Sequence, residues 1–463
     1  MAATTLNLKH SFAASTFPVT GQRRLIYVLV EISGGEGADS LPSNLSFLLD
    51  TSDSMRIRLV TDEQFSELAK NGLAQEVMTD GVPAYQIKSV SNEMINQFPR
   101  RIDYVSQALK VAGDFLRPVD YFNVVAYASR SQILIPPSLG KERQRLLQTA
   151  RELEYLKLGD ETHLAEGMAL ALRELKKASD KQYAPRLVLL SDGYTRNVKE
   201  CYVLARQARK AGIKLSTMGI GIDFNEELLI SLADLTGGNA YFIETPAQLP
   251  EAFRKELGAA LRISYRNVEV KVLLAQGVEL RRVHRVLPEL SNFDMGSGKD
   301  GSYSLWLGDY DPASSQSLLL ELVIPPHSAG SHPLAQLLLV WDDPKGELVR
   351  QSERGHLEVL LSSHATAFIN ERVLDIIEKV GAFRMGTKAL EAAQNAAQSA
   401  DQGEKNSATL RLRQAATQLL NMGEQSLADS MLHQAEHLEK SGTIDPESTK
   451  HLRYETRRMT QRL

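Results

Sequence analysis

Apolar and polar residues follow different periods in different parts of the chain. Between residues 43 and 261, short apolar runs such as residues 45–49, 121–127 and 186–190 alternate with amphipathic stretches of helical spacing, for example residues 101–116. Buried strands that are separated by helices are typical of a mostly parallel sheet with helices on both faces. The pattern therefore predicts a doubly wound α/β domain over residues 43–261.

Residues 262–362 change to a period of two, with turn-forming residues between the alternating runs. This pattern is typical of antiparallel strands, and we predict a small β-sandwich. The run at residues 25–32, which precedes the α/β domain, has the β-branched and aromatic composition of a strand that needs a partner. We therefore predict that residues 1–42 and 262–362 form one sandwich, into which the α/β domain is inserted.

Strand signals disappear in residues 363–463, which are rich in the helix formers Ala, Leu, Gln, Glu and Arg. Four glycines are spaced as helix stops, and the pattern shows no fixed repeat period: Gly381, Gly403, Gly423 and Gly442. We predict a C-terminal helical bundle.

The first clear helix of the α/β domain begins at about residue 101, well after the first strand. Residues 57–99 are therefore interpreted as an insertion that contains a helix at residues 63–73 and a strand at residues 84–90. The insertion begins close to Ser54, at the ligand-binding edge of the predicted sheet. It either gates that edge or contacts a partner there, or it is a neutral surface elaboration.

Composition excludes several classes of function. The 463 residues contain 53 Lys and Arg against 57 Asp and Glu, and a net charge of −4 gives no basic excess for nucleic acid or an anionic membrane. Cys201 is the only cysteine, which excludes an intramolecular disulfide and is compatible with a reducing cytosol. The N-terminus lacks a secretory pattern, and no apolar stretch is long enough to span a bilayer. We expect a cytoplasmic protein.

Oxygen-bearing side chains follow two predicted strands and precede one predicted helix. Asp50, Ser52 and Ser54 come directly after the run at residues 45–49, at the strand end where open α/β sheets bind ligands. Such a spacing alone is more often a turn or a helix cap. However, Thr162 precedes a helical pattern and Asp192 follows a second apolar strand. These hard oxygen donors favour Mg²⁺, and they serve Mn²⁺ equally well.

The set resembles the five-residue metal-ion-dependent adhesion site of von Willebrand factor type A (VWA) domains: Asp50, Ser52, Ser54, Thr162 and Asp192. The resemblance covers roughly residues 43–260 and implies a Rossmann-like VWA fold. It also implies that the two serines and the threonine contact Mg²⁺ directly or through water. The two aspartates are implied to hold coordinated water and to orient the hydroxyls. One coordination position is implied to stay open for an acidic side chain of a partner.

Asp53 departs from the family pattern, which usually has Gly at this position. It is either a loop residue that tolerates a left-handed backbone, as Gly does, or an extra carboxylate that strengthens cation binding or recruits a second, Ca²⁺-like ion. The first interpretation is favoured, because no further acidic cluster follows Met55. His163 and Glu161 flank Thr162 and are interpreted as rim residues.

The expected function is Mg²⁺-dependent protein binding by a scaffold whose partner presents Asp or Glu. The resemblance implies an AAA-type ATPase or a multi-protein assembly as partner. One alternative is an assembly protein that uses the helical tail and the sandwich, with a purely structural metal. A Mg²⁺-dependent phosphohydrolase has the least support, because no G-x-S-x-G elbow and no evident base or nucleophile accompany the site. We expect no catalytic residues.

Overall fold

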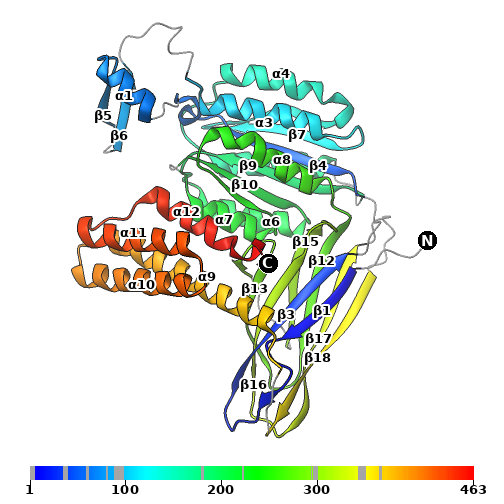
Figure 1. Cartoon of the computed structure of the whole chain (residues 1–463). Helices are drawn as coiled ribbons and strands as arrows, with labels where there is room; N and C mark the ends of the chain where they lie inside the picture. The colour runs from blue at the N-terminus through cyan, green and yellow to red at the C-terminus, as the bar shows by residue number, and fades with distance from the viewer. Residues whose placement is uncertain are drawn as a thin grey trace.

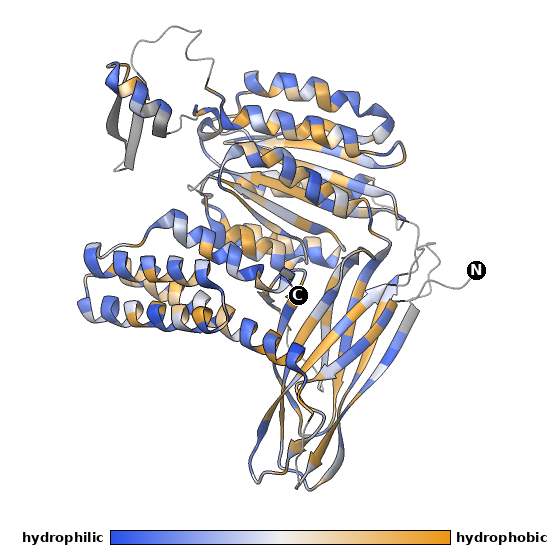
Figure 2. Ribbon diagram, viewed as in Figure 1, coloured by the Kyte–Doolittle hydropathy of each residue, from blue (hydrophilic) through white to orange (hydrophobic). Residues whose placement is uncertain are grey.

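A computed structural model describes residues 6–34, 40–58, 62–79, 82–87, 98–178, 182–221, 224–293, 295, 301–342, 351–363 and 368–462. The chain has an α/β domain, a β unit below it and a bundle of helices beside both (Figure 1). The apolar residues concentrate on the strands of the sheets and on the helix faces that cover them (Figure 2).

The α/β domain is built on a six-stranded sheet with the order β11, β10, β9, β4, β7, β8. All neighbouring pairs are parallel except the edge pair of β7 and β8. In sheet order the strands are β11 (Ala240–Ile243), β10 (Lys214–Ile220), β9 (Ala184–Ser191), β4 (Ser43–Asp50), β7 (Tyr121–Tyr127) and β8 (Ser131–Leu139). β4 is buried along its whole length, and its buried polar residues Asn44 and Ser46 have hydrogen-bond partners.

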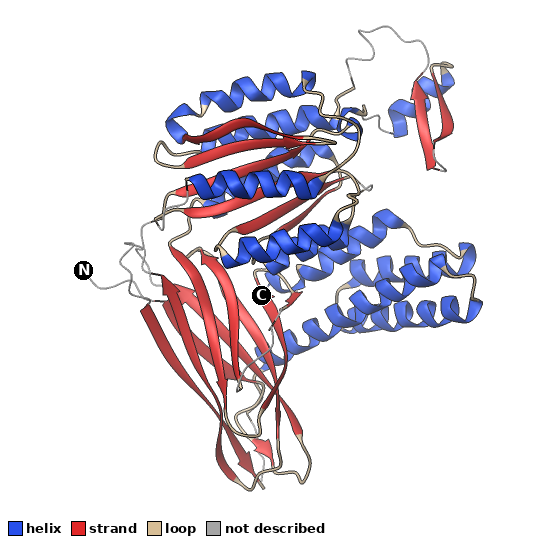
Figure 3. Cartoon of the chain, turned by 180° about the vertical axis from the view of Figure 1, so that it is seen from behind, coloured by secondary structure: helices blue, strands red, loops and turns tan. Residues whose placement is uncertain are grey.

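Helices cover both faces of this sheet, which Figure 3 shows from behind. One face packs against α3 (Arg101–Phe115), α4 (Gln144–Glu152) and α8 (Leu249–Ala260). The other face packs against α5 (Leu164–Lys177), α6 (Val198–Lys210) and α7 (Glu226–Leu235). Short 3₁₀ helices complete the domain: η1 (Asp53–Arg56), η2 (Gly140–Glu142), η3 (Leu153–Tyr155) and η4 (Pro246–Gln248). The doubly wound arrangement expected from the alternating pattern is present.

The order of the strands fixes where a ligand site can form. From β4 the chain runs outward to β7 and β8 and then returns to β9 on the other side of β4. The loops that follow β4 and β9 therefore diverge to opposite sides of the sheet and leave a crevice between them. Residues 51–56 and 192–197 lie in these two loops.

The β unit consists of two five-stranded sheets that share one apolar core. The first sheet contains β1 (Leu6–Phe12), β3 (Arg24–Gly34), β16 (Gln316–Ile324), β13 (Glu279–Leu287) and β14 (Ser291–Asn292). The second contains β15 (Ser302–Tyr310), β12 (Tyr265–Leu274), β17 (Gly330–Asp342), β18 (Gln351–Ser362) and β2 (Phe17–Pro18). Strand β3, which precedes the α/β domain, pairs with β16, which follows it.

The region between η1 and α3 contains a helix and a hairpin, which stand apart from the other layers in Figure 1. The helix α1 (Asp62–Lys70) ends three residues earlier than predicted, and β5 (Ala74–Thr79) was not predicted. Strand β6 (Val82–Ile87) overlaps the strand predicted at 84–90, of which residues 88–90 lie outside the described residues.

The C-terminal region forms four α-helices and a final 3₁₀ helix: α9 (Glu371–Gln398), α10 (Gln402–Asn421), α11 (Gln425–Ser441), α12 (Pro446–Arg457) and η5 (Met459–Arg462). Two predicted helix stops are wrong. Gly381 lies inside α9, where burial of the neighbouring Ala382 and Phe383 outweighs the weak helix propensity of glycine. Gly403 lies in the first turn of α10, and its amide hydrogen bonds to the capping carboxylate of Asp401. Gly423 and Gly442 end α10 and α11 in the left-handed conformation.

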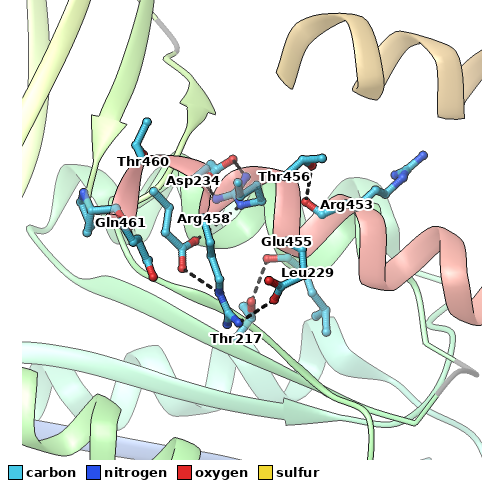
Figure 4. A network of polar contacts seen from close by, with 12 residues as sticks. Thr217, Leu229, Asp234, Arg453, Glu455, Thr456, Arg458, Thr460 and Gln461 are labelled. Atoms are coloured by element: carbon cyan, nitrogen blue, oxygen red, sulfur yellow. Dashed lines mark hydrogen bonds and ion pairs between the residues drawn. The ribbon is translucent and has the colours of Figure 1, made fainter. Parts of the chain in front are cut away.

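The helical bundle is joined to both other units. Leu29, Val286 and Leu319 on the outer side of the first β sheet belong to the same apolar core as the bundle helices. Helix α12 packs on β11 of the α/β domain, with Tyr454 stacked on Phe242 at a ring separation of 5.7 Å, and it forms ion pairs with Glu226 and Asp234 of α7. Polar contacts extend this interface (Figure 4).

Buried charges hold α12 in place. Arg457 donates to both carboxylate oxygens of Asp234, at 2.9 and 2.6 Å, and its Nε lies 3.5 Å from Glu289. Lys450 donates to the carbonyl of Phe224 at 2.6 Å and lies over its ring. Because these groups are shielded from water, each charge depends on its partner.

We predict that Arg457→Met destabilises the folded chain by about 3 kcal/mol, because Asp234 and Glu289 lose their buried counterion. Urea unfolding followed by circular dichroism measures the change. Arg413→Met is the matched control: Arg413 and Glu439 are half exposed, with side-chain exposures of 50% and 54%, and their pair contributes about 0.5 kcal/mol or less. Equal losses in the two variants would contradict the prediction.

Candidate metal centre

Four of the five predicted site residues form one chain of hydrogen bonds. The hydroxyl of Ser52 donates to Oδ1 of Asp50 at 2.6 Å, and the hydroxyls of Ser52 and Ser54 lie 2.9 Å apart. Ser54 then donates to Oδ1 of Asp192 at 2.8 Å. The loops after β4 and β9 are thereby joined across the crevice, with both carboxylates fully buried.

Thr162 lies at the same edge of the sheet. Its hydroxyl oxygen would be 3.2 Å from a Cβ atom placed on Gly193, the residue that follows Asp192. The side chain of Thr195 accepts a hydrogen bond from the Leu164 amide at 3.3 Å, so the loop after β9 also contacts the start of α5. The structure thus brings all five predicted residues to one edge, although the hydrogen-bond chain includes only four of them.

Burial makes the two carboxylates unfavourable neighbours. Desolvation, followed by the negative charge of Asp192, raises the pKa of Asp50 to about 7. Hydrogen bonds from Ser52 act in the opposite direction. A divalent cation between the two loops would remove the electrostatic cost of this arrangement. The donor set, two carboxylates and three hydroxyls, is chemically suited to Mg²⁺ or Mn²⁺.

Arg101 is a site residue that the sequence analysis did not identify. Its Nη1 atom lies 2.8 Å from Oδ2 of Asp192, so each oxygen of this carboxylate has a partner. Arg101 begins α3, and a cation in the first turn is unfavourable for the helix dipole. A cation at this unfavourable position is the sequence feature that could have indicated a role for Arg101 outside the helix. Ser191, whose hydroxyl lies 3.3 Å from Oδ2 of Asp50, was also not predicted.

Asp53 points away from the centre. Its side chain is 72% exposed, and its nearest cation is Arg56, at 3.9 Å. It begins η1, and it is not among the described residues that have a positive φ. The expected left-handed backbone is therefore wrong, because a 3₁₀ turn accommodates this residue without it.

Charged and aromatic side chains surround the centre. His163 contacts Glu161 at 2.9 Å, and Arg196 contacts the same carboxylate at 2.8 Å. Tyr194, in the loop after β9, is 65% exposed. Tyr155 and Ile57 are also exposed, and Arg56, beside Ile57, donates to the backbone oxygen of Glu154, beside Tyr155.

Family models match two parts of the chain. Residues 86–255 match the von Willebrand factor type A domain, and residues 371–462 match the Sll0103-like C-terminal α-helical domain. The chain thus contains a VWA domain followed by a helical domain of the Sll0103-like type. The loop with Asp50, Ser52 and Ser54 precedes the matched VWA segment, which begins at residue 86, within β6.

Protein sll0103 of Synechocystis sp. is 24% identical over 331 residues, which are 70% of this chain and 67% of that protein. A UPF0353 protein of Mycolicibacterium gilvum is 29% identical over 34% of this chain and 52% of its own length. YfbK of Escherichia coli is 24% identical over 46% of this chain and 37% of its own length. The matches to the latter two relatives span about half or less of their lengths.

Two solved structures share the fold over almost the whole chain. A von Willebrand factor type A protein from Catenulispora acidiphila aligns with a TM-score of 0.74 and 16% identity, covering 99% of this chain and 98% of that one. The ArnB paralog VWA2 from Sulfolobus acidocaldarius aligns with a TM-score of 0.54 and 15% identity, covering 99% of both chains. Within the described residues, no helix has the length and apolar composition needed to cross a membrane.

We predict that Arg101→Met increases Mg²⁺ affinity about ten-fold, because the variant removes a positive charge that contacts Asp192. Isothermal titration calorimetry with Mg²⁺ and Mn²⁺ measures the change. Arg100→Met is the control: Arg100 pairs with Asp103 and Glu154 and has no hydrogen bond with the five site residues. Weaker binding in Arg101→Met would mean that Arg101 positions Asp192 for the cation instead of opposing the cation.

Proposed function

We propose that this chain is a Mg²⁺-dependent protein-binding module whose partner presents an Asp or Glu side chain. The observation that carries the proposal is the hydrogen-bond chain from Asp50 through Ser52 and Ser54 to Asp192, at the switch point of the sheet. Asp50, Ser52, Ser54, Thr162 and Asp192 would hold the cation. The cation, when bound, supplies a Lewis-acidic position for a carboxylate oxygen.

The two aspartates supply the negative charge of the site, and their hydrogen bonds fix the positions of the hydroxyl groups. Asp50 and Asp192 are buried and fixed by hydrogen bonds, so they are suited to orient hydroxyls and water. Serine and threonine oxygens are neutral, and they leave more of the positive charge of a cation uncompensated than carboxylates would. A site with few carboxylates therefore favours an acidic ligand from outside.

The surroundings of the centre support binding to a protein surface. Tyr155 and Tyr194 are 77% and 65% exposed, and Ile57 is 55% exposed. Large exposed side chains beside a polar centre are frequent at the energetically important positions of protein interfaces. These residues would contribute contact area. The carboxylate of the partner, bound at the cation, would fix how the two proteins align.

We propose a binding role in preference to catalysis. Side chains beside the five residues include Ser191, Arg101 and the fully buried Tyr127, whose hydroxyl donates to the carbonyl of Leu190. Burial raises the pKa of the Tyr127 hydroxyl well above its usual range, so this group is not suited to act as a base.

We predict that affinity capture from native lysate retains specific proteins in Mg²⁺, loses them in EDTA and loses them with Asp192→Ala. The reason is that the cation would bridge the two proteins. Asp53→Ala is the matched control, because it removes an exposed carboxylate from the same loop and should retain the partner. Mass spectrometry then tests whether an AAA-type ATPase is among the captured proteins.

Capture of the same proteins under all of these conditions would mean that the metal has only a structural role. It would favour the alternative in which the helical domain and the β unit make the contacts of an assembly protein. Deletion of residues 363–463 tests that alternative only if the remaining chain folds, because α12 packs on β11 and pairs with Asp234 of α7.

We predict that Tyr194→Ala weakens binding of the captured partner about ten-fold, because an exposed aromatic contact is lost at the rim. Surface plasmon resonance with the identified partner measures the affinity. Mg²⁺ affinity, measured by calorimetry, should remain within about two-fold of wild type, because Tyr194 is not one of the five residues proposed to hold the cation. Unchanged partner affinity would remove Tyr194 from the interface.

A further inference from the structure

A polar cavity lies at the opposite edge of the VWA sheet from the metal centre. It has a volume of about 210 Å³ and is lined by parts of the α/β domain, the β unit and the C-terminal segment. Lys214 begins β10, and Gly238 and Asn239 precede β11, so these residues mark the amino ends of the strands. Five cationic side chains line the cavity: Arg186, Lys214, Lys255, Arg262 and Arg285.

Arg285 is the unusual member of this set. It is only 6% exposed, and among the described residues its guanidinium forms no hydrogen bond and no ion pair. The guanidinium carbon lies over the ring of Phe293, 5.8 Å from the ring centroid. The negative charge of Asp234 acts on Arg285, but both oxygens of Asp234 accept hydrogen bonds from Arg457. A buried guanidinium ordinarily has a carboxylate or phosphate partner.

The acidic side chains in the cavity wall mostly have other partners. Asp311 accepts from Arg262 at 3.0 Å and from the amide of Ala313 at 2.9 Å. Glu289 lies 3.5 Å from Nε of Arg457. Asp309 lies 3.9 Å from Arg266, and its Oδ1 atom accepts no hydrogen bond. The wall thus contains five cationic and three acidic side chains, and one of the cations, Arg186, pairs with the buried Glu256 behind the wall. None of these acids pairs with Arg285.

The surplus of cations has an electrostatic cost. Burial, followed by the positive charge of Arg186, lowers the pKa of Lys214 to about 7. Burial also lowers the pKa of Arg285. The ammonium of Lys214 donates to the backbone oxygen of Asp309 at 2.6 Å, so it is held at the cavity. An anion in this cavity would stabilise both charged side chains.

We propose that this cavity binds a small organic anion, whose phosphate or carboxylate group pairs with Arg285. A guanidinium binds either group through two parallel hydrogen bonds. Lys255, which is exposed, would attract the anion at the cavity mouth. The volume, small compared with the roughly 300–1,000 Å³ of drug-sized ligand pockets, limits the ligand to a few carbon atoms. The site is separate from the proposed metal centre and does not depend on it.

The test uses the full chain and isothermal titration calorimetry with inorganic phosphate in one arm and succinate in the other. Sodium chloride at matched ionic strength is the reference. We expect a dissociation constant of about 1 mM or tighter for one of the two anions, which identifies the chemical class of the ligand. Thermal unfolding in the same solutions should show a higher midpoint with that anion than with chloride.

Three variants separate the proposed role from a general effect of charge. Arg285→Met should weaken anion binding at least about ten-fold, and Lys255→Met should weaken it about three-fold without disturbing the core. Arg281→Met removes an exposed arginine from the same strand and should bind the anion like the wild type.

The proposal is overturned if neither phosphate nor succinate binds or stabilises the wild type more than chloride does. It is also overturned if Arg281→Met and Arg285→Met weaken binding equally. If Arg285→Met fails to fold, the comparison of Lys255→Met with Arg281→Met decides, and equal affinities in that pair would contradict the proposed cavity.

Discussion

The pairing of β3 with β16 is the constraint on which the arrangement of the molecule depends. Nine residue pairs connect residues 24–32 with residues 316–324. In the sequence, the whole α/β domain lies between these two strands. Because an antiparallel ladder fixes the register of its strands, the two ends of the intervening chain are also fixed. The Leu41 amide donates to the Ile263 carbonyl at 2.7 Å, so the α/β domain is entered and left at one point.

Local sequence patterns were sufficient to predict the elements that carry the metal centre. The mostly apolar segments 45–49 and 187–190 reflect burial on both faces of a parallel sheet, and the oxygen-bearing residues follow them closely. All five predicted residues accordingly lie at one edge. Arg101 could not be assigned to this edge from periodicity, because its contact with Asp192 depends on how the chain returns after the segment that contains α1, β5 and β6.

Tertiary packing decided the points at which sequence patterns were insufficient. Gly381 and Gly403 have weak intrinsic helix propensity, but burial of the adjacent residues in α9 and the cap at Asp401 keep them helical. Arg285 occupies a strand position, and nothing in its local sequence indicates that its side chain is buried where three parts of the chain meet. The residues that surround a side chain such as that of Arg285 come from distant parts of the chain. Periodicity predicts only which face of a helix or strand is buried.

The single point of entry has a mechanical consequence when it is combined with the docking of α12. Beside this point, Lys214 of the α/β domain donates to the carbonyl of Asp309, and Arg209 lies over the ring of Trp306 in the β unit. The contacts of Lys450 with Phe224 and of Arg457 with Asp234 add an attachment to the helical bundle, on α7 and the loop before it. The helices are in turn fixed to the β unit, so the three units form a closed triangular frame. A ligand that touched the metal edge and the helical bundle together would meet two surfaces at a fixed spacing, and its binding would require little ordering of the protein.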